Sequence, residues 1–365
     1  MSADTNRFAD GLSNLLKRKE ALAVIALLLL LSFNLFFTPG FFDLRVKDGH
    51  LYGSLVDIIK RGSPLMFMVL GMTLVIATGS TDISVGSIAA ITAAVVARLI
   101  GSDFAAFRAG VDASTQTPMF MAILAGLSVA AVCGVWNGFL VAKLGVQALV
   151  ATLMLQVAGR GIAQLITNGT IISVYYKPFA FFGSGYLLGL PVSIYVVLAL
   201  TILMFAFTKY TAYGLFLQAS GSNRSSSRYA GVKVQETIWI AFIINGIMAG
   251  VAGILIASEV KSADCNNCGL YYELDAILAV VLGGNSMKGG KFSIAGSLIG
   301  ALLVQTLTTT IYMRGVPSET ILAVKAIVVI IVGIIQTTNY EKLKQRLSGR
   351  KQAVLGTVQE AESNE

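Results

Sequence analysis

Apolar runs of membrane-spanning length recur along this chain and restrict its fold more than any other feature. A helix needs about 20 residues to cross the roughly 30 Å hydrocarbon core of a bilayer. About ten runs approach that requirement, two of them short, and they cover residues 21–37, 70–96 (two runs divided by a polar break), 119–141, 146–167, 190–207, 238–257, 274–282, 294–311 and 320–335. The sequence therefore predicts an all-α polytopic membrane protein with about ten transmembrane helices, some short or broken.

Composition and charge agree with a membrane protein. The chain has 55% hydrophobic and 13% charged residues, whereas soluble domains carry about 25% charged residues. An even number of crossings puts both termini on one side. Placing them in the cytoplasm gives the cytoplasmic segments more Lys and Arg than the outer ones, as the positive-inside rule requires. The net charge of +8 is thus explained by topology, and we expect no nucleic-acid partner.

The chain divides into three parts. Residues 1–20 form a basic cytoplasmic segment, residues 21–338 the transmembrane region, and residues 339–365 a charged cytoplasmic tail. A cleaved signal peptide is an alternative for the first apolar run, but residues 36–40 contain no small-residue cleavage site, so we expect an uncleaved span. Residues 38–63 are predicted to form a long polar connection between the first two spans.

A polar break divides the two apolar runs of residues 70–96, each of which is short for a span. Thr78 to Ser87 includes one carboxylate, on Asp82, and several hydroxyl groups. Such groups are costly at membrane depth unless they face protein or water. Two structures fit this pattern. One is an ordinary polar turn between two spans, capped by Asp82. The other is a pair of helix segments that meet at a break lining a cavity, where Ser80 or Asp82 caps the second segment.

The break also carries a resemblance to a known family. Gly71 to Ser87, GMTLVIATGSTDISVGS, is similar to the signature of the permease subunits of bacterial sugar ABC importers, the ribose, galactose, xylose and galactofuranose group. The usual form is close to GMTLVIATGGIDLSVGS, and this chain departs from it mainly at Ser80 and Thr81. Asn137 and the glycine after it resemble an Asn-Gly pair of the same family. We expect the sugar path to include Thr78, Ser80, Thr81, Asp82, Ser84, Gly86 and Asn137.

A second motif lies in residues 209–235, which are too polar to cross lipid. A solvated basic loop that obeys the positive-inside rule is one interpretation. However, residues 219–232 resemble the family pattern GxNxxAAxxxGI, which forms the short coupling helix that docks on the ATPase. The resemblance implies coupling residues Gly221, Asn223, Arg224, Arg228 and Gly231, although Ser226 and Ser227 stand where the family usually has alanines. Gly221 and Gly231 would bracket two or three helical turns.

A third motif, ELDAILAVVLGG at residues 273–284, resembles the same family, particularly the galactofuranose permeases. Glu273 and Asp275 suit the positive end of a helix dipole, and we expect that structural role for them rather than sugar binding. No phosphate loop of the form GxxxxGK[ST] occurs in the chain. We therefore expect a transport subunit that is no enzyme, with no nucleotide site and no cofactor of its own.

Two cysteines and two charged residues remain to be placed. Cys265 and Cys268 fall in a predicted outer loop, where they could form a small disulfide or remain two free thiols. Zinc would require two further ligands, and the single histidine, His50, is far away, so no metal site is expected. Arg160 and Lys325 lie toward the outer ends of their spans, where snorkelling to the interface is the expected role and a functional one the alternative.

Together the three motifs imply the permease subunit of a monosaccharide ABC importer in the bacterial inner membrane. The likeness is closest to galactofuranose and fructose import permeases. It implies an identical or related second permease, two cytoplasmic ATPase subunits and an extracytoplasmic sugar-binding protein. An ion-coupled secondary sugar transporter is the alternative, because such transporters also place unwound segments at the substrate site. An intramembrane enzyme would need a nucleophile or metal-ligand constellation, which the sequence does not suggest.

Overall fold

Helices dominate the structure, a computed structural model that describes residues 19–47, 49–109, 115–317 and 320–327. Residues 1–18 and the expected tail at residues 339–365 lie outside the described residues. Contacts divide the chain into two units, Met1–Arg314 and Gly315–Glu365. The second unit is described mainly by helical residues 320–327, which begin the last expected span.

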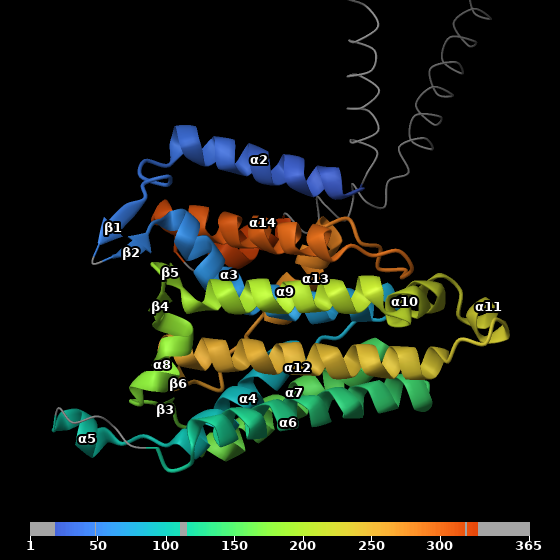
Figure 1. The fold of residues 1–365 in the computed structure, drawn as a ribbon, viewed down its shortest axis with the longest axis horizontal. Helices are drawn as coiled ribbons and strands as arrows, with labels where there is room; N and C mark the ends of the chain where they lie inside the picture. Colours follow the sequence, from blue (N-terminus) through green and yellow to red (C-terminus); the bar gives the residue numbers. More distant parts are fainter. Residues whose placement is uncertain (1–18, 48, 110–114, 318–319, 328–365) are drawn as a thin grey trace, which may run out of the picture. The chain divides into compact units, whose positions relative to one another are not determined.

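The first unit contains the following elements in chain order (Figure 1): α2 (Lys19–Phe37), β1 (Arg45–Lys47), β2 (His50–Tyr52), α3 (Ser54–Ala77), α4 (Val85–Ile100), α5 (Phe104–Arg108), α6 (Met119–Gly138) with a π-helical turn (Phe139–Lys143), α7 (Ala148–Thr167), β3 (Ile172–Ser173), α8 (Lys177–Ser184), β4 (Tyr186–Leu187), β5 (Leu190–Pro191), α9 (Val192–Tyr210), α10 (Ala212–Ser222), α11 (Arg224–Tyr229), α12 (Val234–Val260), β6 (Ser262–Ala263), α13 (Tyr272–Leu282) and α14 (Ile294–Met313).

Six helices in the described part of the chain are long and apolar enough to cross a membrane, namely α3, α6 with its π-helical turn, α7, α9, α12 and α14. Two shorter apolar helices accompany them, Ala23–Phe37 of α2 and Val85–Ile100, which is α4. α13 is shorter still, with 11 residues. The predicted class, a helical polytopic membrane protein with some short helices, is confirmed.

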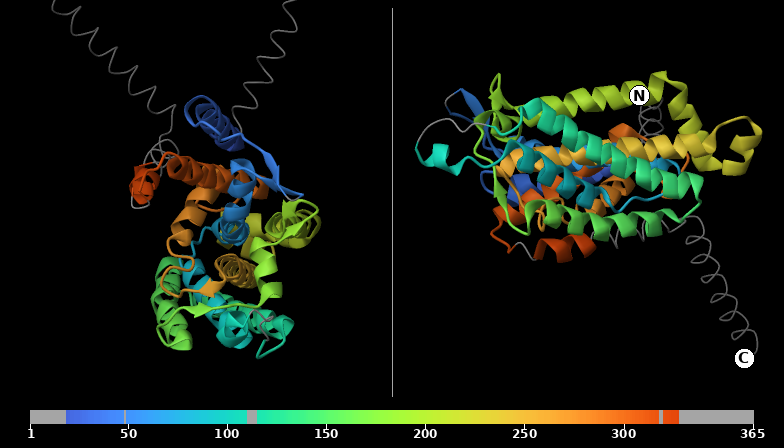
Figure 2. Two further views of the ribbon diagram at one scale, coloured as in Figure 1. Left: turned by 90° about the vertical axis from the view of Figure 1, so that its left-hand side faces the viewer. Right: turned by 90° about the horizontal axis from the view of Figure 1, so that it is seen from below.

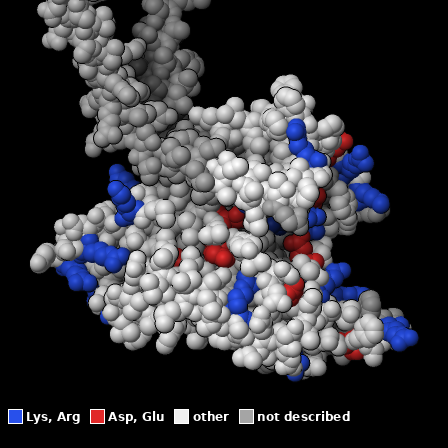
Figure 3. Space-filling view, turned by 180° about the vertical axis from the view of Figure 1, so that it is seen from behind, with Lys and Arg blue, Asp and Glu red and all other residues white. Residues whose placement is uncertain are grey.

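The long helices run alongside one another, and the connections gather at the two ends of the first unit (Figures 1 and 2). One end carries three antiparallel two-stranded sheets, β1–β2, β3–β6 and β4–β5; we call it the hairpin end. The other carries α10 and α11, and we call it the α11 end. Most Lys and Arg side chains in Figure 3 lie toward these two ends, whereas the surface between them is mostly white, with several Asp and Glu side chains and little Lys or Arg. This distribution suits a unit whose middle lies in lipid.

α3 and α12 form the centre of the bundle, where most of their residues are buried. α12 packs on α3, α4 and α6, while α14 packs on α2, α3 and α13. α9 is covered by neighbours over only a small part of its surface. The polar segments of interest therefore lie against the two central helices.

The start of α3 corrects one sequence prediction. α3 begins at Ser54, so residues 54–63 belong to a 24-residue helix and not to a polar connection. The charged side chains that suggested a connection, Asp57, Lys60 and Arg61, lie in the first turns at the hairpin end and are half-buried or exposed. The first apolar run of residues 70–96 is thus the end of a complete span. Only the second run, which forms the 16-residue α4, is short.

Candidate functional site

A non-helical segment enters the bundle from the α11 end. α3 ends at Ala77, residues 78–84 are non-helical, and α4 begins at Val85. Within this segment Asp82 contacts Asn245, which lies about 16 Å along α12 from its first residue, Val234. α4 therefore starts inside the bundle and not at its end.

Asp82 is fully buried and joins three elements through hydrogen bonds. Its Oδ1 accepts from the main-chain N–H of Ser84 at 2.8 Å and from the Ser84 hydroxyl at 2.6 Å. Its Oδ2 accepts from Nδ2 of Asn245 on α12 at 2.8 Å. Asn137 of α6 donates from Nδ2 to the Ser84 Oγ at 2.7 Å. The carboxylate thus fastens the segment to α6 and α12.

Neither Ser80 nor Asp82 caps α4, contrary to the sequence prediction. The residue before the helix is Ser84, whose side chain makes no capping hydrogen bond. Instead the main-chain N–H of Ser87, in the first turn, donates to Oε1 of Gln156 on α7 at 3.2 Å. A side chain from a neighbouring helix thus satisfies one of the free amides at the start of α4.

The residues predicted for the sugar path are mostly buried. Thr78, Ser80, Asp82, Ser84, Gly86 and Asn137 are buried, and Thr81 is half-buried. Several of their polar atoms bond within the protein; for example, the Thr78 hydroxyl donates to the carbonyl of Val75 at 2.7 Å. In this conformation these side chains face protein, and Thr81 is the most accessible of them.

A second non-helical segment enters from the hairpin end. It follows α12 and β6 and continues to Tyr271, after which α13 begins. A Cβ placed on Gly86, the second residue of α4, would lie 2.4 Å from the carbonyl oxygen of Gly269. A Cβ on Gly253 would lie 2.3 Å from the carbonyl oxygen of Ala89, and Gly253 is about 10 Å along α12 from its end at Val260. The two short helices α4 and α13 thus begin next to each other inside the bundle.

The position of this second segment changes the interpretation of the cysteine pair. Cys265 and Cys268 are free thiols and are buried, at 4% and 6% exposure. They belong to an apolar cluster with residues of α4, α6 and α7, such as Ala90, Ala122 and Ala163. The Cys265 thiol donates to the carbonyl of Ala163 at 3.3 Å. The expected outer loop is therefore a segment packed into the bundle, and of the two states considered the thiols adopt the unbonded one.

Polar residues at every fourth position of α7 contact both non-helical segments and the start of α4. Thr152 Oγ1 accepts from the N–H of Ile83 at 3.2 Å, and Gln156 bonds to Ser87. Arg160 Nη1 donates to the carbonyls of Cys265 and Cys268 at 2.9 and 2.6 Å. Gln164 Nε2 donates to Asn266 Oδ1 at 2.7 Å. Arg160 therefore does not snorkel to the interface, because the second segment covers its guanidinium.

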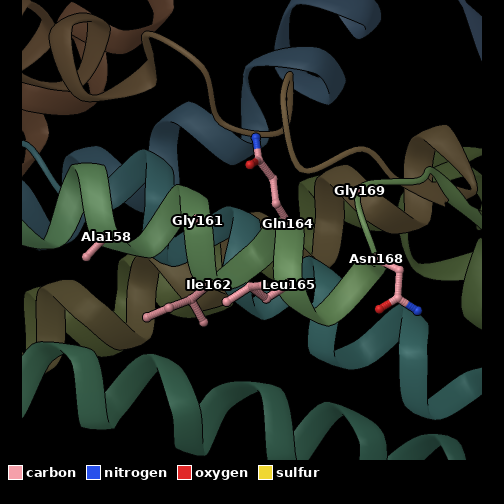
Figure 4. A pocket seen from close by; sticks show the side chains of 7 residues that line it. All are labelled: Ala158, Gly161, Ile162, Gln164, Leu165, Asn168 and Gly169. Atoms are coloured by element: carbon pink, nitrogen blue, oxygen red, sulfur yellow. The ribbon is translucent and has the colours of Figure 1, made fainter.

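Beyond this row of polar residues, the surface of α7 is largely apolar and exposed. A hollow of about 530 Å³ lies there, lined by Ala158, Gly161, Ile162, Gln164, Leu165, Asn168 and Gly169. Figure 4 shows Gln164 pointing to one side of the helix and Ile162 and Leu165 to the other. The polar residues of α7 thus border a face that nothing in the described chain covers.

At the α11 end three chain segments meet through close backbone contacts. The N–H of Gly290 donates to the carbonyl of Ala77 at 2.9 Å. A Cβ on Gly221 would lie 1.8 Å from the same carbonyl oxygen. Gly221 was predicted to mark the start of the coupling helix. It is instead the penultimate residue of the preceding helix, α10, where the absence of a side chain permits this contact. Arg224 Nη2 donates to the carbonyl of Thr78 at 3.1 Å and approaches the Ser80 hydroxyl at 3.4 Å.

α11 itself is a six-residue helix that projects from the α11 end (Figure 1). Asn223 caps it, since its Oδ1 accepts from the N–H of Ser226 at 3.0 Å. The helix ends before Gly231, whose φ of +84° suits glycine. Arg228 is exposed and Tyr229 is 93% exposed. The helix is shorter than the predicted two or three turns, because Asn223 breaks it from α10.

The contacts of the two non-helical segments also involve three residues to which the sequence analysis assigned no functional role: Gln156, Asn245 and Glu273. Their signal was available in part: Gln156 lies one turn before Arg160 on the same helix, and Asn245 is a polar residue in the middle of an apolar span. Lys325, which with Arg160 was expected to snorkel, lies half-buried in helical residues 320–327. In the part of the chain that the structure describes, no group of three or more His, Cys, Asp or Glu could hold a metal ion.

Comparison with known proteins places the chain in a family. Residues 54–333 match the family model described as branched-chain amino acid transport system / permease component. The galactofuranose transporter permease protein of Escherichia coli (strain K12) is 40% identical over 90% of this chain and 92% of its own. The fructose import permease protein of Bifidobacterium longum (strain NCC 2705) is 32% identical over 96% of each chain. The ribose import permease protein of Escherichia coli (strain K12) is 34% identical over 86% of this chain and 92% of its own. No solved structure matches.

Proposed function

The chain belongs to the branched-chain amino acid transport system / permease component family, and from this membership we propose that it is the transmembrane permease of an ABC importer for a monosaccharide. The relatives reported above carry galactofuranose, fructose and ribose in their names, which favours a sugar over an amino acid. A permease component works with other components, so we do not propose the self-contained ion-coupled transporter. Galactofuranose, fructose or a related sugar is the proposed substrate.

We further propose the partners and the orientation. Two cytoplasmic ATPase subunits supply the energy, an extracytoplasmic sugar-binding protein delivers the sugar, and a second, identical or related, permease completes the path. The α11 end and both termini face the cytoplasm of a bacterial cell, and the hairpin end faces outward. The exposed projection of α11, with Arg228 and Tyr229 on it, supports this assignment, because coupling to an ATPase requires a surface that extends beyond the lipid.

The observation that carries the proposal is the meeting of two non-helical segments inside the bundle. Residues 78–84 enter from the α11 end, and the segment ending at Tyr271 enters from the hairpin end. Non-helical backbone at membrane depth is tolerated where it is buried in protein or lines a cavity, and transporters place such segments at the substrate. We propose that the sugar passes beside this junction. The residues from Thr78 to Gly86 would then border the half of the sugar path that is nearer the cytoplasm.

The direct test is reconstitution of the permease with its ATPase in vesicles, with the sugar-loaded binding protein on the outer side. ATP-dependent accumulation of labelled D-galactose, D-fructose or D-ribose is expected, with no accumulation when ATP is withheld. L-leucine serves as the comparison substrate. Accumulation of leucine but of no sugar, or uptake driven by an ion gradient without ATP, would refute the proposal.

A further inference from the structure

Two charged side chains leave polar atoms unpaired where α4 and α13 begin. Glu273 is only 8% exposed; its Oε1 accepts from Gln156 Nε2 at 3.2 Å, but its Oε2 has no hydrogen-bond partner. Arg160 uses Nη1 for two carbonyls, and its Nε and Nη2 are buried without partners. Arg160 and Glu273, both within the described residues, do not form an ion pair with each other. Because buried polar groups are almost always paired, these atoms point to a missing ligand.

The three residues lie together at the junction of the two non-helical segments. Gln156 and Arg160 are one turn apart on α7, and Gln156 contacts both the start of α4, at Ser87, and Glu273 in the first turn of α13. A Cβ on Gly86 would lie 2.5 Å from Glu273 Oε2, so this oxygen lies against the start of α4. Gln156 and Arg160 are half-buried and border the uncovered face of α7, from which a ligand can approach.

The unpaired atoms are suited to a hydroxyl-rich ligand. One acceptor, on Glu273, and two donors, on Arg160, are available, and a sugar hydroxyl both donates and accepts. Hydrogen bonds to charged groups are stronger than those between neutral groups. A carboxylate ligand would meet both the Glu273 carboxylate, which repels it, and the Arg160 guanidinium, which attracts it. The preference for a sugar over an amino acid therefore comes from the proposed function and is decided by the leucine comparison in the test.

We infer that Gln156, Arg160 and Glu273 form a binding station that holds the sugar midway along its path. This inference rests on the proposed function and adds to it the residues that contact the substrate. The station lies where the non-helical segment from the hairpin end meets the start of α4, which follows the segment from the α11 end. Glu273 thus has a second role beyond the favourable interaction with the start of its own helix.

The test uses the complete importer in vesicles and measures sugar uptake and ATP hydrolysis together. Glu273→Gln preserves the shape of the side chain but removes its charge. We expect the sugar imported per ATP hydrolysed to fall about tenfold, which corresponds to the loss of one charged hydrogen bond. ATP hydrolysis stimulated by the loaded binding protein should persist. Asp275→Asn, which removes a carboxylate from the same turn of α13, is the matched control and should leave the ratio unchanged.

A second variant gives an independent measurement of occupancy. Gln156→Cys, made in a Cys133→Ser background, introduces a half-buried thiol into a chain whose other two thiols, on Cys265 and Cys268, are buried. Cys133 is replaced because it is itself half-buried. The imported sugar should slow its reaction with a small methanethiosulfonate reagent, and leucine should not. This measurement decides the question if Glu273→Gln does not fold.

The outcomes separate the two proposals. A wild-type complex that imports no sugar would overturn the proposed function and, with it, the station. Two results would overturn the station alone, provided that the wild-type complex imports sugar. One is an unchanged amount of sugar imported per ATP in Glu273→Gln, and the other is Gln156→Cys labelling that sugar does not slow. If Glu273→Gln loses uptake, ATP hydrolysis and thermal stability together, the variant does not fold and the Gln156→Cys labelling alone decides whether the station exists.

Discussion

Arg224 donates from Nη2 to the main-chain carbonyl of Thr78 at 3.1 Å and so joins the projecting helix α11 to the segment that follows α3. Four residues further on, that segment contains Asp82, which is bonded to α12. A displacement of α11 therefore has a short, hydrogen-bonded route to the interior of the bundle. Arg224 and Arg228, both expected to couple the permease to the ATPase, are both exposed, and Arg224 in addition bonds to the main chain of this segment.

Arg224→Gln should weaken the link between ATP hydrolysis and transport. Glutamine is shorter and uncharged, so the bond to the Thr78 carbonyl is lost while α11 keeps its Asn223 cap. We expect sugar uptake per ATP to fall several-fold in reconstituted vesicles, with the ATPase still bound. An unchanged ratio would show that the bond does not transmit movement.

Arg228→Glu should weaken assembly with the ATPase. Its side chain is exposed on α11, so reversing its charge alters the docking surface without disturbing the bundle. The amount of ATPase that co-purifies with the permease should fall. Arg45→Glu is the control, because it reverses a charge at the hairpin end on a side chain that is 81% exposed. This variant should co-purify with as much ATPase as the wild type. An equal loss of ATPase in both variants would contradict the proposed docking role of Arg228.

Asp82→Ala should destabilise the protein more than Asp82→Asn. Alanine leaves the Ser84 N–H, the Ser84 hydroxyl and the Asn245 amide without their acceptor. Each buried group left unpaired costs about 1–3 kcal/mol. Asparagine still offers one oxygen to Ser84 and should cost less. Thermal unfolding in detergent measures the difference, and equal stability of the two variants would show that the carboxylate does not hold the segment.

Gly221→Ala should destabilise the α11 end by about 1–3 kcal/mol, the usual cost of overpacking. The added methyl group would lie 1.8 Å from the Ala77 carbonyl oxygen and 2.5 Å from the Gly290 nitrogen. Gly161→Ala is the control, because nothing lies within 4 Å of its added methyl and alanine favours a helix. A lower melting temperature is expected for Gly221→Ala but not for Gly161→Ala. Equal melting temperatures for the two variants would refute the close packing of Gly221 against Ala77.

Cys265 and Cys268 should resist alkylation in the folded protein. Both thiols are buried and unbonded, so a maleimide reagent should label them only after denaturation, and without prior reduction. Mass spectrometry of the native and the denatured chain separates the states. Labelling in the native state would show that the second segment leaves the bundle, and labelling that requires a reductant would reveal a disulfide.

Much of the fold could be predicted from the sequence, because membrane crossing imposes length and polarity on each helix. The apolar runs predicted α6, α7, α9, α12 and α14 closely, and the polar break predicted the gap between α3 and α4. The start of α3 was missed because its first turns carry Asp57, Lys60 and Arg61, and charge near a helix end resembles the charge of a connection.

The candidate site was only partly predictable. The resemblance directed attention to the break and to residues 219–232, and the structure connects the two through Arg224. The second non-helical segment was taken for an outer loop, because nothing in its composition separates a segment in water from one packed against α7. Arg160 was expected to snorkel for the same reason.

The sequence by itself determined the helical membrane class, the approximate helix boundaries and the positions of the polar interruptions, since these follow from residues close together along the chain. Only the tertiary structure decided that the two interruptions meet inside the bundle and that Gln156, Arg160 and Glu273 gather there. The physical reason is that hydrogen bonds between helices depend on the depth and rotation of each helix. Packing contacts such as those between Gly86 and Gly269 fix that depth and rotation between residues far apart in sequence.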